Sequence, residues 1–180
     1  MKGIVFTEFL EMVESNYGLG IVDSIIENCD LPSGGAYTSV GTYDFNEMVS
    51  LIGELSKQTE VTQEKLLYSF GLYLFGGLIS AHPEVVASYR NPMGLLYGIE
   101  DHIHVHVRKL YPDAELPRFK ILSKTDDSLE MIYISSRGLY ALAHGLIEKT
   151  FEHFGKNVQV DYKLLNEKGT EVKFAIVQNG

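Results

Sequence analysis

Cysteine and basic residues are scarce in this chain of 180 residues, and each scarcity excludes a class of site or partner. The single cysteine, Cys29, forms neither an internal disulfide nor a cysteine-based zinc site by itself, which fits a reducing compartment. Lys and Arg number 15 against 24 Asp and Glu, so the net charge is −9. Such a chain repels phosphate backbones and anionic lipids, and we therefore expect neither nucleic acid nor membranes as partners.

Long apolar runs are also missing. The longest apolar stretch without Asp, Glu, Lys or Arg runs from Leu66 to Ala81 and is followed by His82-Pro83. This stretch is shorter than the roughly 20 residues that cross a bilayer. Glu8 and Glu11 interrupt the apolar residues near the amino terminus before the core of an export signal could form. A hydrophobic content of 45% is ordinary for one globular domain of this length. We therefore expect a folded, cytoplasmic protein.

The spacing of apolar residues divides the chain into a helical first part and a mixed second part. Apolar residues recur every three or four positions in the first part, which predicts helices over residues 6–17, 22–26, 43–57 and 64–80. Beyond Pro117, alternating segments predict strands over residues 118–122, 128–135, 158–164 and 171–177, with a helix over residues 138–154. The pattern predicts an α+β fold in which a small antiparallel sheet carries a helix.

The predicted helix over residues 64–80 has almost no polar face. Such a helix is either packed on all sides in the core, or it has one face against a large apolar ligand. Its glycines at 71, 76 and 77 permit the close approach of a flat ligand or of another helix. The pattern leaves both interpretations open.

Three of the six histidines lie at alternate positions in one short segment. In a strand, His102, His104 and His106 would share one face, as in a metal-binding strand. A helix over residues 92–111 is favoured instead, because its apolar stripe is regular and prolines lie at both boundaries. On this helix His102 and His106 share a face one turn apart, whereas His104 points elsewhere.

These histidines allow two kinds of metal site. A zinc site on His102 and His106 would need further ligands, and no HExxH motif supplies a general base. Solvation, or pairing with Glu100 and Asp101, is the alternative for those two side chains. His104 remains a candidate for another role, the axial ligand of a haem.

Three polar residues end the second predicted strand. Tyr133, Ser135 and Arg137 alternate along it and would therefore project from the same face. A phenol, a hydroxyl and a guanidinium together suit a pair of carboxylates, such as the propionates of a haem. An ordinary strand end is the other interpretation, because so short a pattern often arises by chance.

Together these motifs resemble the haem nitric oxide/oxygen binding (H-NOX) family, which includes the haem domain of the soluble guanylate cyclase β chain. The resemblance covers essentially the whole chain and rests on Met1-Lys2-Gly3, His104-x-His106, Lys109-Leu110-Tyr111-Pro112, Leu116-Pro117-Arg118-Phe119 and Tyr133-x-Ser135-x-Arg137. It implies one domain over residues 1–180, with a helical lobe of about residues 1–60 and haem-enclosing helices and sheet over about residues 61–180. The implied fold is a helical subdomain packed on a four-stranded antiparallel sheet with one or two helices, the haem lying between them.

The resemblance also assigns roles to residues. It implies haem b as the cofactor, with His104 as the proximal iron ligand and the Tyr-x-Ser-x-Arg motif as the propionate clamp. Pro117 matches the residue that presses on the porphyrin and helps to hold it out of plane. Asp44 is a looser match to an acidic residue that pairs with the clamp arginine in some relatives.

The position that decides between gases is apolar. Oxygen-binding relatives carry a distal tyrosine five residues after the clamp arginine, and Leu142 stands there in this chain. Bound dioxygen is polarised and gains from a hydrogen-bond donor, whereas bound nitric oxide needs none. Tyr140 lies two residues earlier, a rotation of about 200° along a helix, and we expect it to point away from the iron.

The rest of the expected distal wall is apolar too. Phe9 and Leu74 stand where the oxygen-binding relatives place a tryptophan and an asparagine, and Val5 and Leu146 complete the wall. We therefore expect the protein to bind nitric oxide and CO, and not to bind dioxygen measurably.

The family implies signalling to a separate protein. Because the chain ends at Gly180, we expect it to act in trans on a histidine kinase or a diguanylate cyclase, through weakening of the bond between iron and His104. We expect no catalysis, since no nucleophile and base are placed around the pocket. Two other classes stay open: a zinc-dependent hydrolase using His102, His104 and His106, and a haem-free interaction module.

Overall fold

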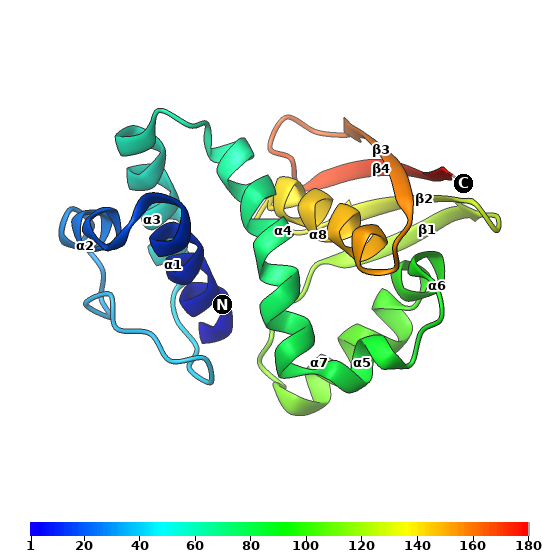
Figure 1. The fold of residues 1–180 in the computed structure, drawn as a ribbon, viewed down its shortest axis with the longest axis horizontal. Coiled ribbons are helices and arrows are strands. Elements are labelled where there is room, and N and C mark those ends of the chain that lie inside the picture. The colour runs from blue at the N-terminus through cyan, green and yellow to red at the C-terminus, as the bar shows by residue number, and fades with distance from the viewer. Residues whose placement is uncertain (180) are drawn as a thin grey trace.

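Helices occupy the chain up to residue 110, and a four-stranded sheet with one more helix follows (Figure 1). The computed structural model describes residues 1–179. Its helices are α1 (Gly3–Tyr17), α2 (Leu19–Glu27), α3 (Phe45–Thr59), α4 (Gln63–Ala81), α5 (Pro83–Ala87), α6 (Pro92–Tyr97), the π-helical turn η1 (Ile99–Ile103), α7 (His104–Leu110) and α8 (Tyr140–His153). Its strands are β1 (Arg118–Lys124), β2 (Ser128–Ile134), β3 (Asn157–Leu164) and β4 (Glu171–Asn179). The α+β class predicted from the sequence is confirmed.

Helices α1 and α3 pack against one side of α4, with α2 packed on α1 and α3, and the sheet lies on the other side of α4 (Figure 1). Side-chain oxygens fix where two of the helices begin. Asp44 accepts a hydrogen bond from the amide of Asn46 at 2.9 Å before α3, and Thr62 accepts one from Lys65 at 3.4 Å before α4. The apolar faces meet in a cluster of fully buried side chains, which includes Phe6, Phe9, Met12, Ile25, Leu51, Leu55 and Phe70.

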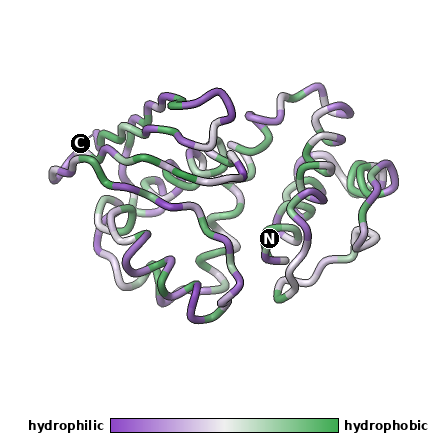
Figure 2. Tube along the Cα trace, turned by 180° about the vertical axis from the view of Figure 1, so that it is seen from behind, coloured by the Kyte–Doolittle hydropathy of each residue, from purple (hydrophilic) through white to green (hydrophobic). Residues whose placement is uncertain are grey.

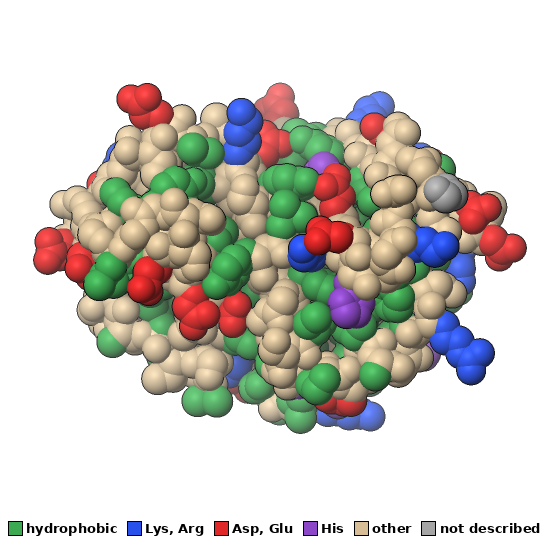
Figure 3. Space-filling model, viewed as in Figure 1, with side chains coloured by type: hydrophobic (Ala, Val, Ile, Leu, Met, Phe, Trp, Pro, Cys, Tyr) green, Lys and Arg blue, Asp and Glu red, His purple; other side chains and the backbone are tan. Residues whose placement is uncertain are grey.

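Most of the negative charge belongs to these amino-terminal helices. Residues 1–60 contain ten Asp and Glu and two Lys and Arg, a net charge of 2 − 10 = −8 out of −9 for the chain. Figure 3 shows acidic side chains gathered over this part of the molecule.

The sheet is antiparallel, with the order β1-β2-β4-β3. Alternate side chains of its two central strands are buried and face one another across the ladder, so Leu129 pairs with Ile176 and Met131 with Phe174. With Ile147 and Phe151 of α8 they form a second hydrophobic cluster, separate from the first. Hydrophobic segments accordingly run through both parts of the molecule (Figure 2).

Helices α4 and α8 join the two halves and lie unusually close together. A Cβ atom added to Gly145 would lie 2.2 Å from the carbonyl oxygen of Tyr68, and one added to Gly71 would lie 2.3 Å from that of Leu142. Only glycine permits this approach of the two backbones. The helix over residues 64–80 is therefore a core helix, with α1 and α3 on one side and α8 on the other.

Two predicted elements differ from the structure. The single helix expected over residues 92–111 is divided into α6, η1 and α7, and β2 ends at Ile134 where a strand to residue 135 was expected. Helix α5 was not predicted; Pro83 occupies its first turn, a position where proline favours a helix. Within residues 1–179, no helix combines the length and the apolar character needed to span a membrane.

Candidate functional site

His104 is the first residue of α7 and follows directly on the π-helical turn η1. In that turn the carbonyl oxygen of Gly98 accepts hydrogen bonds from the amides of both His102 and Ile103, at 3.0 and 3.1 Å. Such turns insert an extra residue into a helix and are frequent at functional sites. The His104 residue that follows is only 8% exposed.

Glu100 orients the His104 ring from one turn earlier. The Nδ1 atom of His104 lies 2.7 Å from Oε1 of Glu100, and the ring also lies tilted over Phe119 of β1, with 6.0 Å between centroids. Burial lowers the pKa of His104, and the hydrogen bond to Glu100 offsets part of that effect. Because a carboxylate only accepts hydrogen bonds, Nδ1 is the protonated nitrogen, and Nε2 is left as the lone pair for a metal.

The other two histidines of this segment have different neighbours. His102 is exposed, and its Nδ1 lies 3.3 Å from the hydroxyl of Tyr89. His106 lies beside Glu84, with 3.5 Å between Nε2 and the carboxylate. The structure therefore does not bring His102, His104 and His106 into one site, and the strand interpretation of this segment was wrong.

The three residues expected to form a clamp lie at the end of β2 and in the turn that follows. Tyr133 is 2% exposed, and its hydroxyl accepts a hydrogen bond from the amide of Leu139 at 2.9 Å. Burial raises the pKa of Tyr133, so the phenol keeps its proton as a donor. Ser135 accepts a hydrogen bond from the amide of Arg137 at 3.2 Å, which closes a tight turn.

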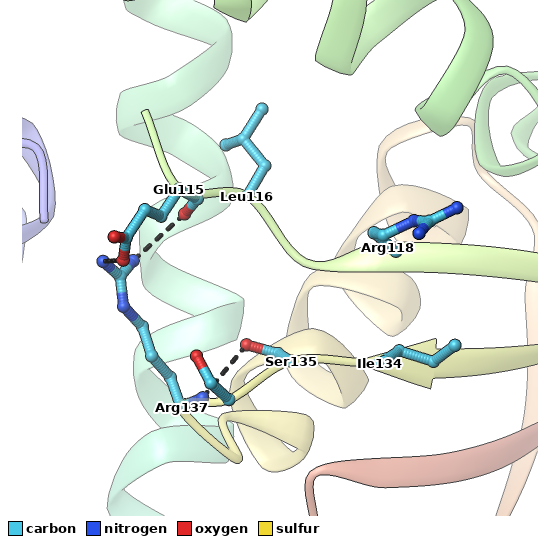
Figure 4. A pocket seen from close by; sticks show the side chains of 7 residues that line it. Glu115, Leu116, Arg118, Ile134, Ser135 and Arg137 are labelled. Atoms are coloured by element: carbon cyan, nitrogen blue, oxygen red, sulfur yellow. Dashed lines mark hydrogen bonds and ion pairs between the residues drawn. The ribbon is translucent and has the colours of Figure 1, made fainter. Parts of the chain in front are cut away.

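Arg137 points away from Ser135 toward the segment before β1 (Figure 4). Its guanidinium donates to the carboxylate of Glu115 at 2.6 Å and to the backbone oxygen of the same residue at 3.1 Å, and it lies over the ring of Phe45. A cavity of about 230 Å³ opens between Glu115, Ser135 and Arg137. Strand β2 ends at Ile134, so the alternation of a strand does not extend to Arg137, whose side chain is turned toward Glu115.

Two further expectations concern the same region. Pro117 is half-buried in the segment between α7 and β1, two residues after Glu115. Asp44 caps α3, and the acidic partner of Arg137 is Glu115 instead. Nothing in the sequence signals this pair, because the two residues are 22 positions apart in segments of unrelated pattern.

The five residues of the expected distal wall all belong to one hydrophobic cluster. Phe9 of α1 and Leu74 of α4 are buried in it, whereas Val5 of α1 and Leu142 and Leu146 of α8 are half-buried against it. None of these side chains carries a hydrogen-bond donor.

Tyr140 lies on a different face of α8 from Leu142. It packs with the second cluster, and its hydroxyl donates to Glu64 at 3.1 Å. Its phenol is therefore engaged away from the side chain of Leu142.

The residues present fit a haem. Nε2 of His104 could hold the iron, half-buried apolar side chains could line a wall, and Tyr133 and Arg137 could donate to carboxylates. To hold a propionate, Arg137 would have to release Glu115, whose side chain is 78% exposed. An ion pair with one partner so exposed contributes little stability, so this exchange of partners is easy.

Comparison with known proteins finds one family, the H-NOX proteins. The family model described as Haem-NO-binding matches residues 2–162. An H-NOX protein from K. algicida in the unliganded Fe(II) state is 48% identical, with a TM-score of 0.97 and coverage of 100% of this chain and 97% of that one. An H-NOX protein from S. oneidensis in the Fe(II)NO state is 27% identical, with a TM-score of 0.92 and full coverage of both chains.

A third solved structure adds another ligand. The H-NOX from Shewanella woodyi, in the Fe(II)CO state and bound to IWP-051, is 36% identical, with a TM-score of 0.84 and coverage of 99% of this chain and 95% of that one. A search of curated proteins finds no match.

Proposed function

Since the chain belongs to the Haem-NO-binding family, we propose that this haem-binding gas sensor is selective for nitric oxide and CO over dioxygen, and that His104 holds its haem b. When bound, the haem supplies the ferrous iron that takes up the gas. The single observation that carries the selectivity is the apolar wall of Val5, Leu142 and Leu146. Each group of side chains in the site has a separate role in this proposal.

His104 and Glu100 form the proximal side. The Glu100 carboxylate accepts the Nδ1 proton at 2.7 Å, which fixes the tautomer and directs the Nε2 lone pair to the iron. The same contact increases the electron density on the ring and therefore strengthens its bond to the metal. In this proposal His104 is the only protein ligand of the iron, and His102 and His106 take no part.

Tyr133, Ser135 and Arg137 hold the propionates. Tyr133 keeps its proton because burial raises its pKa, and Arg137 supplies the positive charge once it turns from Glu115. Pro117 lies in the segment that follows Glu115 and would contact the porphyrin from there. These contacts orient the haem between the two hydrophobic clusters.

The distal side discriminates between gases because its side chains carry no hydrogen-bond donor. Dioxygen takes on negative charge when it binds ferrous iron and is stabilised by a donated hydrogen bond, but the wall residues have no donor to offer. Nitric oxide and CO bind ferrous haem strongly without such help. The hydroxyl of Tyr140 cannot serve, because it is engaged with Glu64 on another face of α8.

The output passes through α7 to a partner in trans. If the bond between iron and His104 were lost, α7 would be free to shift, and the helical lobe of residues 1–60 could move against the part over residues 61–180. A histidine kinase or diguanylate cyclase that binds one arrangement better reads this change of population. The family relationship supports this class of partner.

Absorption spectra of the reduced protein test the selectivity. We expect the Soret band to shift with nitric oxide and with CO, and not to shift with dioxygen before slow oxidation sets in. Leu142→Tyr places a donor on the wall and should give a reversible spectral change with dioxygen. Tyr140→Phe is the control and should behave as wild type, whereas a reversible dioxygen spectrum in wild type would refute the proposal.

A further inference from the structure

A second cluster of metal-binding side chains lies on α7, outside the proposed haem site. It consists of His82, at the end of α4, Glu84 in the first turn of α5, and His106 in α7. The ligand atoms of all three lie within 4.8 Å of one another. A Glu84 oxygen lies 3.6 Å from Nδ1 of His82 and 3.5 Å from Nε2 of His106.

The chain holds these side chains in place by local structure. Pro83, between His82 and Glu84, fixes the backbone and starts α5, so the two ligands are presented by a rigid turn. The rings of His82 and His106 approach edge to face, with 6.2 Å between centroids. Two segments of the chain, the turn at residues 82–84 and α7, therefore meet at one point.

One atom of the cluster has unsatisfied bonding capacity. Nε2 of His106 is shielded from solvent and, within residues 1–179, has no hydrogen-bond partner. The Glu84 carboxylate at 3.5 Å is at ion-pair distance but does not form a hydrogen bond with it. A shielded imidazole nitrogen that faces a carboxylate and a second imidazole is in the position of a metal ligand.

We propose that His82, Glu84 and His106 bind one divalent transition-metal ion, Zn²⁺ in the first instance. Two imidazoles and one carboxylate are a zinc ligand set, and the fourth tetrahedral position is left to water. Zinc bonds of about 2 Å require neighbouring ligand atoms at roughly 3.3 Å. The two distances to Glu84, 3.6 and 3.5 Å, are close to that value, whereas the two imidazole nitrogens lie within 4.8 Å of each other and would have to move closer together. The three side chains are 24%, 59% and 41% exposed, so the cluster lies near the surface although Nε2 of His106 itself is covered.

This site shares no ligand with the proposed haem site. His104 bonds to Glu100, away from this cluster. A zinc ion here would nevertheless fasten α7, the helix that carries His104, to the junction of α4 and α5. It would therefore restrict the movement of that helix.

Zinc titration of the untagged, haem-loaded protein by isothermal calorimetry tests the proposal. We expect one Zn²⁺ per chain. His82→Gln, Glu84→Gln and His106→Gln should each weaken binding by at least about tenfold, since a lost ligand costs no less than a lost outer partner. His102→Gln is the matched control, because this exposed histidine of the same segment contacts Tyr89 instead.

Three results would overturn the zinc site: no binding in wild type, equal binding in wild type and His82→Gln, or an equal loss in His102→Gln. His82→Gln and Glu84→Gln lie outside α7, so they remain informative if His106→Gln disturbs that helix. Unchanged Soret bands of the variants show that the haem site is intact. The gas spectra test the gas-sensor proposal separately, so either proposal can fail without the other.

Discussion

At the scale of single residues, two carboxylates determine how the key side chains of the site are oriented and charged. His104 is given its tautomer by Glu100, and Arg137 is neutralised by Glu115. In the proposed site, the first pair would strengthen a metal ligand, whereas the second occupies the guanidinium that is proposed to bind a propionate. A carboxylate beside a functional side chain can therefore either assist it or compete with the ligand.

This competition predicts opposite effects for the two members of the Arg137 pair. Arg137→Ala should lower haem affinity by about 1.5–3 kcal/mol, because a hydrogen bond to a charged group is lost. Glu115→Gln removes the competitor and should leave haem affinity unchanged or raise it. The rate at which each variant loses its haem to apomyoglobin measures both effects. Equal weakening by the two substitutions would show that the pair supports the haem together.

The role of Arg137 could be predicted from the sequence only in part. The residue types of Tyr133-x-Ser135-x-Arg137 indicate carboxylate binding, but their geometry depends on where β2 ends. The side chain of Ser135 bonds to the amide of Arg137 and so competes with continued strand pairing. Ser135 therefore turns the backbone at the end of β2 and redirects Arg137, although the spacing of residues in the sequence still reads as a strand.

At the scale of elements, the contact of α4 with α8 determines the position of the distal wall. Leu74 belongs to α4 and Leu142 to α8, and the two helices meet where Gly71 and Gly145 lie. Because glycine carries only a hydrogen atom where other residues carry a side chain, Gly71 and Gly145 let the two helix backbones approach closely and so determine their spacing.

Gly145→Ala should separate the two helices and destabilise the fold. Its Cβ atom would lie 2.2 Å from the carbonyl oxygen of Tyr68, a backbone atom that cannot move alone. We expect a loss of about 1–3 kcal/mol in the free energy of unfolding, as for overpacked cores. Gly76→Ala in α4 is the control: no atom lies within 4 Å of its Cβ position, so it should stabilise by about 0.5–1 kcal/mol. Denaturation in urea measures both, and equal effects would contradict the close contact.

Long periodic elements were predictable at this scale, and interrupted ones were not. Helix α1 was predicted over residues 6–17 and runs from Gly3 to Tyr17. The segment over residues 92–111 carries an equally regular apolar stripe, yet it contains a π-helical turn just before His104. Apolar periodicity averages over several turns, so one additional residue in one turn leaves almost no trace.

At the scale of the whole molecule, two hydrophobic clusters are joined by the contact of α4 with α8. The apolar wall belongs to the first cluster, while Tyr133 and the Phe119 ring beside His104 pack with the second. A haem between them would connect the two through its iron. The bond between iron and His104 is therefore the contact whose loss would let the parts move independently.

Resonance Raman spectroscopy of the reduced, gas-free protein tests this bond most directly. We predict an iron–histidine stretching band in wild type, its loss in His104→Gly, and its return when imidazole is added to that variant. His102→Gly should keep the band, as a control for substitution in the same segment. An iron–histidine band that persists in His104→Gly without imidazole would contradict the assignment of His104 as the iron ligand.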